Sequence, residues 1–121
     1  LLAGRMLAAV PGSPRIEIHG FSQGTAAACR WVALGGRRAD RLVLWGGGVP
    51  PDLPLERHGA ALRQAGLTMI GGERDKLHPI AEFEKETARL TAAGVPPQVH
   101  RFDGGHRVHG ETLRALTGEA P

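Results

Sequence analysis

Short strand-like segments alternate along this chain with longer, helix-like segments, and that order restricts the fold more than any other feature. The strand-like segments are 15–20, in which apolar and polar residues alternate, 41–47, a continuous apolar run, 67–72 and 97–104. The segments with the length and punctuation of helices are 25–36, 54–66, 78–97 and 106–118, with the end of a further helix at 1–10. Strands separated by helices pair in parallel through right-handed crossovers. The sequence therefore predicts an α/β fold, a parallel sheet with helices on both faces.

The length and composition fit one domain that spans residues 1–121. The hydrophobic fraction is 41% and the charged fraction 22%, as in a globular protein. No apolar run reaches the roughly 18 to 20 residues of a membrane span. The formal charge is +3, but the arginines are scattered and often stand beside acids, as in Glu73-Arg74-Asp75. This dispersed pattern argues against a nucleic-acid partner.

Cys29 is the single cysteine of the chain. One cysteine cannot form an intramolecular disulfide, so nothing points to an oxidising compartment, and we expect a cytoplasmic protein. Cys29 lies among alanines in a predicted helix. We expect it to be a small buried hydrophobic residue rather than a reactive thiol.

The sequence Gly20-Phe21-Ser22-Gln23-Gly24 stands between the first predicted strand and the first predicted helix. A serine nucleophile on a sharp strand-to-helix turn needs small residues two before and two after it, and Gly20 and Gly24 meet that need. The backbone N–H of Gln23, at the helix N-terminus, would then point at a developing oxyanion. The pattern predicts a nucleophile elbow at Ser22.

A serine hydroxyl needs a base, and the base needs an acid that orients it. After such an elbow the expected order along the chain is serine, acid, histidine. Asp75 follows the third predicted strand and His106 the fourth. Because the carboxyl ends of parallel strands meet at one edge of a sheet, we expect Ser22, Asp75 and His106 to lie together.

Other residues compete for these roles. Asp75 could instead cap the helix that begins near Pro79, and Asp103 is a second candidate acid, although its place before Gly-Gly suits a turn. His106 is preferred to His109 because it directly follows the Gly-Gly turn. His100, His106 and His109 suggest a metal cluster, but no cysteine or paired carboxylate completes a ligand set. We expect no metal and no organic cofactor.

The segments "GFSQG", "GGERDKLHP" and "GGH" resemble the three catalytic blocks of the phospholipase/carboxylesterase family of α/β-hydrolases, which includes acyl-protein thioesterases. The resemblance runs from about residue 5 to 117. It implies a serine esterase or thioesterase with Ser22 as nucleophile, Asp75 as acid and His106 as base. It also implies the Gln23 N–H as an oxyanion donor and a small acyl ester as substrate. "LWGGGVPPD" resembles the family's glycine-proline loop near the acyl pocket.

The chain departs from this family before the elbow. A complete α/β-hydrolase has further strands there, and one early loop supplies a second oxyanion donor. We therefore expect a partial hydrolase domain that is N-terminally incomplete, with the outer edge of strand 15–20 open to a partner or a missing segment. The alternative is an inactive hydrolase fragment that acts as an interaction module. A dienelactone-type hydrolase would want cysteine at position 22.

Overall fold

Four parallel strands form one sheet in the computed structural model, in the order β1-β2-β3-β4. The structure describes residues 16–35 and 39–117. The strands are β1 (Glu17–Phe21), β2 (Arg41–Trp45), β3 (Leu67–Gly72) and β4 (Gln98–Phe102), and the helices are α2 (Gly24–Leu34), α3 (Leu55–Gln64), α4 (Ile80–Ala92) and α5 (Gly110–Thr117). The predicted helix at 1–10 and the predicted strand residue Arg15 lie outside the described residues.

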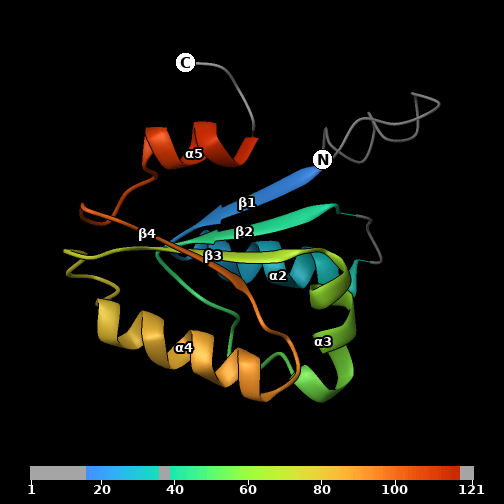
Figure 1. Ribbon diagram of the computed structural model, residues 1–121. Coiled ribbons are helices and arrows are strands. Elements are labelled where there is room, and N and C mark those ends of the chain that lie inside the picture. The colour runs from blue at the N-terminus through green and yellow to red at the C-terminus, as the bar shows by residue number, and fades with distance from the viewer. Residues whose placement is uncertain (1–15, 36–38, 118–121) are drawn as a thin grey trace.

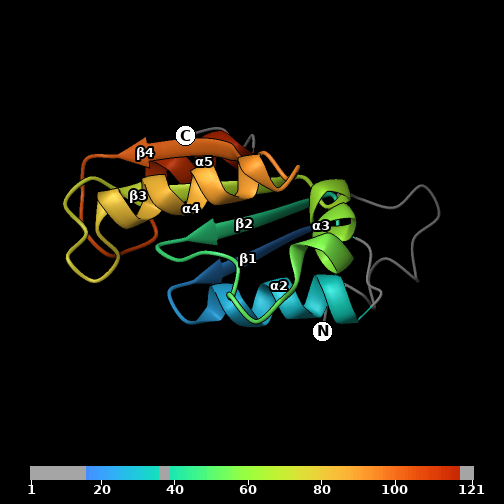
Figure 2. The same cartoon turned by 90° about the horizontal axis from the view of Figure 1, so that it is seen from below.

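The helices cover both faces of the sheet, as the α/β prediction required. Figures 1 and 2 show α2, α3 and α4 on one side and α5 on the other. The strand β2 is apolar and buried from Leu42 to Trp45, as expected of a strand with both faces covered. Leu42 and Leu44 join the core beneath α2, α3 and α4, whereas Val43 and Trp45 join the smaller core beneath α5.

Two helices are shorter than their sequence patterns predicted. The helix expected at 78–97 spans only Ile80–Ala92, because Pro79 stands at its N-cap and Gly94 has a φ of 82° just beyond its end. The helix expected from 106 begins at Gly110. His106 and His109 therefore lie in the loop before α5 rather than in its first turn.

The strands β1 and β4 are the two edges of the sheet. In the described part of the chain no strand pairs with the outer side of β1. All four strands point the same way, so the loops after β1, β2, β3 and β4 converge at one end of the sheet (Figure 2). That end is where chemistry collects in parallel sheets.

Candidate active site

Ser22 occupies a sharp turn between β1 and α2. Its φ is 57°, and among the described residues it is the one non-glycine residue with a positive φ. Three hydrogen bonds hold this conformation: the Ser22 N–H donates to Trp45 O at 2.8 Å, and Ser22 O accepts from Thr25 N at 3.1 Å and from Thr25 Oγ1 at 2.7 Å. An L-residue in the left-handed region costs of order 1–3 kcal/mol and persists where its surroundings impose it.

The two glycines around the turn have different reasons to be small. A Cβ on Gly20 would lie 2.6 Å from Gly24 O and 2.8 Å from Thr25 Cα, so β1 and α2 can approach only because Gly20 lacks one. A Cβ on Gly24 would meet nothing within 4 Å. The steric need predicted for both positions is thus present at Gly20 alone.

The structure brings Ser22, His106 and Asp75 into one chain of hydrogen bonds. The distance from Ser22 Oγ to His106 Nε2 is 2.9 Å, and that from His106 Nδ1 to Asp75 Oδ2 is 2.7 Å. The three side chains come from the loops after β1, β4 and β3, as their sequence order predicted. The side chain of Asp75 is 1% exposed and that of His106 15% exposed, so water has little access to this chain of bonds.

The surroundings of Asp75 keep it ionised. Burial by itself raises the pKa of a carboxyl group, but hydrogen bonds from the His106 ring and from the backbone N–H groups of His78 and Leu77 bring the pKa of Asp75 below its usual 3.8. An ionised carboxylate only accepts hydrogen bonds, so His106 Nδ1 carries the proton it donates. In the neutral ring, Nε2 is then the acceptor for the Ser22 hydroxyl.

The loops that carry Asp75 and His106 are joined through their backbones. Glu73 N donates to Phe102 O and Arg74 N donates to Gly104 O, both at 2.9 Å. A Cβ on Gly72 would lie 2.5 Å from Gly104 O, so this position must be glycine for the loops to meet. Gly72, the second glycine of "GGERD", thus lets the two loops touch.

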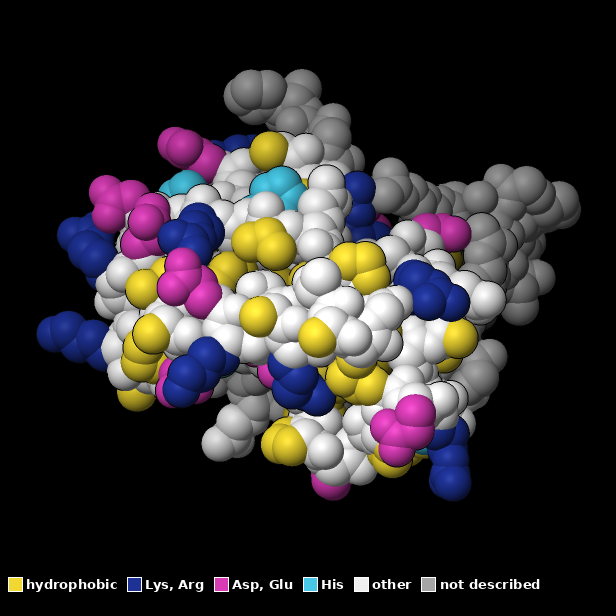
Figure 3. Space-filling model, turned by 60° about the horizontal axis from the view of Figure 1, so that its bottom comes forward, with side chains coloured by type: hydrophobic (Ala, Val, Ile, Leu, Met, Phe, Trp, Pro, Cys, Tyr) yellow, Lys and Arg dark blue, Asp and Glu magenta, His cyan; other side chains and the backbone are white. Residues whose placement is uncertain are grey.

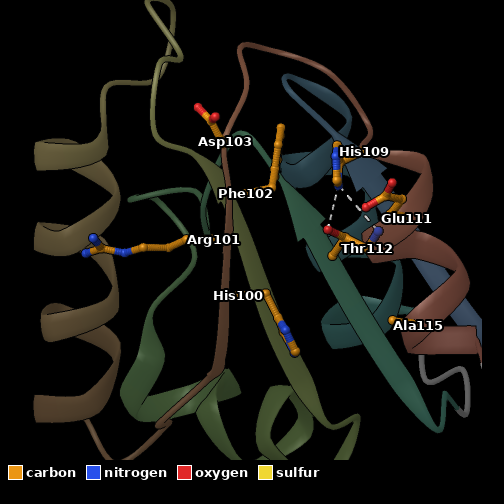
Figure 4. Close-up of a pocket in the computed structure, with 8 residues that line it drawn as sticks. All are labelled: His100, Arg101, Phe102, Asp103, His109, Glu111, Thr112 and Ala115. Carbon is orange, nitrogen blue, oxygen red and sulfur yellow. Dashed lines mark hydrogen bonds between the residues drawn. The ribbon is translucent and has the colours of Figure 1, made fainter.

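The competing residues lie elsewhere. Asp103 is exposed and pairs with Arg74 at 3.0 Å rather than with a histidine. The His109 ring stacks on Phe102, and its Nδ1 lies 2.8 Å from Thr112 Oγ1. His100 and His109 line a cavity of about 480 Å³ between β4 and α5 (Figure 4). The geometry therefore selects Asp75 and His106 as the partners of Ser22.

Several neighbours of these residues were not identified from the sequence. The buried Thr25 holds the Ser22 carbonyl, and the ring of Phe21 packs against the ring of His106. The glycine loop 46–48, by contrast, belongs to the segment that the family resemblance placed near the acyl pocket, and here Gly46 lies beside His106 and Gly47 beside Ser22 O. Of these contacts, the sequence could have indicated only that of Thr25 with Ser22 O, because a threonine at the start of a helix often bonds to a backbone group three residues before it.

Other features of the described residues bear on the alternatives. No group of three or more His, Cys, Asp or Glu side chains in residues 16–35 and 39–117 could hold a metal ion. On the face shown in Figure 3, Lys and Arg side chains are dispersed, and several lie beside Asp or Glu side chains. No helix in the part described is long and apolar enough to cross a membrane. Cys29 is fully buried, as predicted, and burial raises the pKa of its thiol to about 12.

Solved structures share this architecture. No protein-family model and no curated protein matches the chain. The acyl-protein thioesterase 2 of Zea mays matches 97% of this chain at 19% identity, with a TM-score of 0.69 over 61% of its own chain. A variant of Arabidopsis thaliana SOBER1 matches 97% at 19% identity, with a TM-score of 0.71 over 57% of its chain. Esterase PE8 matches 84% at 19% identity, with a TM-score of 0.60 over 47% of its chain.

These coverages show that the chain spans about half to three-fifths of the length of the proteins it resembles. The agreement extends over nearly all of its own length. The chain has the same α/β fold, a parallel sheet covered by helices on both faces, as the matching parts of these thioesterase and esterase structures.

Proposed function

We propose that this chain carries the catalytic centre of a serine hydrolase that cleaves carboxylic esters or thioesters. The observation that supports the proposal most directly is the pair of hydrogen bonds from Ser22 to His106 and from His106 to Asp75. The strained backbone at Ser22 adds to it, since strain of this kind is concentrated at functional sites. The names of the similar structures, an acyl-protein thioesterase and an esterase, suggest the same substrate classes.

In the proposed reaction, Ser22 Oγ attacks the acyl carbonyl while His106 Nε2 takes its proton. Asp75 stabilises the resulting imidazolium through Nδ1–H. His106 then gives the proton to the leaving alcohol or thiol, and an acyl-enzyme on Ser22 remains. Water, deprotonated by His106, attacks this ester and releases the acid. The cycle requires no metal or organic cofactor.

The backbone N–H of Gln23 is the proposed donor to the oxyanion. Gln23 is the N-cap residue of α2, and its N–H makes no hydrogen bond with any residue that the structure describes. A free N–H at a helix N-terminus favours developing negative charge. A second donor would come from outside the residues described here, as the family resemblance implies.

A fluorophosphonate probe tests this proposal, because it reacts covalently with an activated serine. We expect the 121-residue chain to be labelled and Ser22→Ala to remain unlabelled. The same pair of proteins is then compared on an aryl ester and on an acyl thioester. Labelling of Ser22→Ala at the wild-type rate would disprove the assignment of the nucleophile.

The outer edge of β1 supports a second candidate. In the described residues no strand pairs with the outer side of β1, and a groove of about 260 Å³ lined by Ile18, Ala28 and Trp31 among others runs alongside. We propose that a partner or a further segment covers this edge.

In the alternative function, the chain is an inactive interaction module built on a hydrolase fold. A folded wild-type chain that resists labelling would favour that alternative. The single domain and the cytoplasmic location expected from the sequence stay predictions.

A further inference from the structure

The loop after β2 contains three consecutive glycines and lies against both Ser22 and His106 of the proposed catalytic chain. A Cβ on Gly46, whose φ is 62°, would lie 3.0 Å from Cε1 of His106, and a Cβ on Gly47 would lie 2.8 Å from Ser22 O. The serine turn and the imidazole ring thus pack directly against the backbone of this loop. Glycine has the greatest backbone freedom of any residue, so the backbone of such a loop needs to be held by contacts at both of its ends.

One end of the loop is fixed by the sheet, and the other by two side chains of α4. At the first end, Gly46 N donates to Ile70 O of β3 at 3.1 Å. At the second, Val49 N donates to Glu86 Oε2 at 2.7 Å, and Val49 O accepts from Arg89 Nη2 at 3.1 Å. The two polar groups of one residue are therefore held by two side chains one helical turn apart.

Glu86 and Arg89 also hold each other. Arg89 Nε lies 2.8 Å from Glu86 Oε1, and Arg89 Nη2 lies 3.0 Å from Glu86 Oε2. Such a two-pronged pair has a defined geometry, unlike a single contact between flexible side chains. The Glu86 side chain is 16% exposed, and a Cβ on Gly48 would collide with its carboxylate. The pair and the glycine loop thus fit each other closely.

Packing alone does not determine how the loop's peptide groups are oriented. The Val49 side chain is buried, which holds its position, but a cavity of about 340 Å³ lies beside the loop and is lined by Gly48, Val49, Glu86 and Arg89 among others. Beside a cavity, peptide groups can rotate unless hydrogen bonds prevent it. The bonds from Val49 to the pair supply that restraint.

From these contacts we infer that Glu86 and Arg89 are positioning residues for the hydrolase site, acting through loop 46–49 on Ser22 and His106. The inference rests on the proposed function, since it assigns the pair a role in that reaction. Neither side chain touches the reacting atoms. Their effect is to keep Gly46 and Gly47 in the places that the nucleophile and the base require.

The test compares Glu86→Ala, Glu86→Gln and a matched control in the full 121-residue chain. Glutamine keeps an oxygen that can accept from Val49 N, whereas alanine removes it. The control is Glu84→Ala, which breaks an exposed ion pair between α4 and Arg101 of β4, away from the loop. The readouts are the saturation kinetics of fluorophosphonate labelling and the hydrogen exchange of the Val49 amide.

We expect Glu86→Ala to lower the limiting rate constant of labelling about 10- to 100-fold at an unchanged probe affinity, because small misplacements of reacting groups have effects of this size. Glu86→Gln should recover most of the rate, and Glu84→Ala should match the wild type. The Val49 amide should exchange faster in Glu86→Ala alone. If Glu86→Ala only destabilised the fold, a smaller fraction of the molecules would be labelled. The molecules that remained folded would still react with the wild-type rate constant.

Two results would overturn the inference: a folded Glu86→Ala with the wild-type rate constant, or a Val49 amide whose exchange does not respond. A wild-type chain that cannot be labelled would instead contradict the proposed function. Since amide exchange is read without the probe, the restraint of Val49 by Glu86 would still be tested in that case. The two failures can therefore be told apart.

Discussion

The rings of Phe21 and His106 are in contact, with 4.8 Å between their centroids and 43° between their planes. Phe21 immediately precedes Ser22, so the strand residue beside the proposed nucleophile also contacts the proposed base. Phe21 is 38% exposed, so its ring is not part of the buried core.

Removal of the Phe21 ring should therefore slow the reaction of Ser22. Ring contacts contribute about 0.5–1.5 kcal/mol, so Phe21→Ala should lower the rate constant of fluorophosphonate labelling about 2- to 10-fold. Val99→Ala, which trims another exposed apolar residue on β4, is the control and should have no effect. Equal rates for the two variants would show that the ring does not support His106.

The two glycines of the elbow should respond differently to alanine. Gly20→Ala places a Cβ against the backbone of Gly24 and Thr25, and we expect it to abolish labelling and to lower the melting temperature. Gly24→Ala meets open space in the first turn of α2, where alanine is favoured by up to about 1 kcal/mol. It should be at least as stable as the wild type. Equal losses in both variants, measured by thermal denaturation, would contradict this account.

The lowered pKa of Asp75 makes part of the stability depend on pH. As the pH falls, the unfolded chain takes up the proton at about 3.8, before the folded chain does. The contribution of Asp75 to the free energy of unfolding is therefore complete above about pH 5 and is lost as the pH falls through 3.8 towards the lower folded-state pKa.

Asp75→Asn checks this dependence, because asparagine does not titrate. The difference in unfolding free energy between the wild type and Asp75→Asn, from urea denaturation, should be largest near neutral pH and should shrink below pH 3.8. Asp103→Asn, which removes an exposed carboxyl, is the control for loss of a charge. A difference that stayed constant with pH would mean that Asp75 is not preferentially ionised in the folded chain.

Cys29 should not react while the chain is folded. Burial and the nearby Glu86 carboxylate raise the pKa of its thiol to about 12, so at pH 8 only about one molecule in 10⁴ carries the thiolate. Ellman's reagent should detect no thiol in the native protein and one after denaturation in guanidinium. Rapid reaction of the native chain would show that α2 opens locally.

Much of the fold could be predicted because its signals are local. The uninterrupted apolar run of β2 and the alternation of strands with helices were enough to predict a parallel sheet covered on both faces. The start of α5 was predicted four residues too early. The reason is tertiary: His106 is held by Ser22 and Asp75, and the side chain of His109 bonds to Thr112 at the beginning of the helix.

The residues of the candidate site could be predicted from the sequence for a related reason. The glycines around Ser22, the order of serine, acid and histidine along the chain and the position of each residue after a strand were enough to predict that Ser22, Asp75 and His106 lie together, since parallel strands bring their carboxyl ends together. The contacts that support these residues could not be predicted in this way. Glu86 meets Val49 across 37 positions of the chain, through a backbone group that has no sequence signature. The sequence pattern likewise predicted the same steric role for Gly24 as for Gly20. Only the three-dimensional structure shows which of the two positions has no room for a Cβ.

The hydrogen bond between Ser22 and His106 joins residues 84 positions apart, from loops that follow the first and the last strand of the sheet. A contact of such long range forms only after the intervening strands have docked in register. The reactivity of Ser22 is therefore also a reporter of cooperative folding. Loss of labelling and loss of circular dichroism should share one denaturant midpoint, as in two-state unfolding. The same topology ties the proposed chemistry to the integrity of the whole sheet: a cut in any of its crossovers separates the proposed nucleophile from its base or the proposed base from its acid.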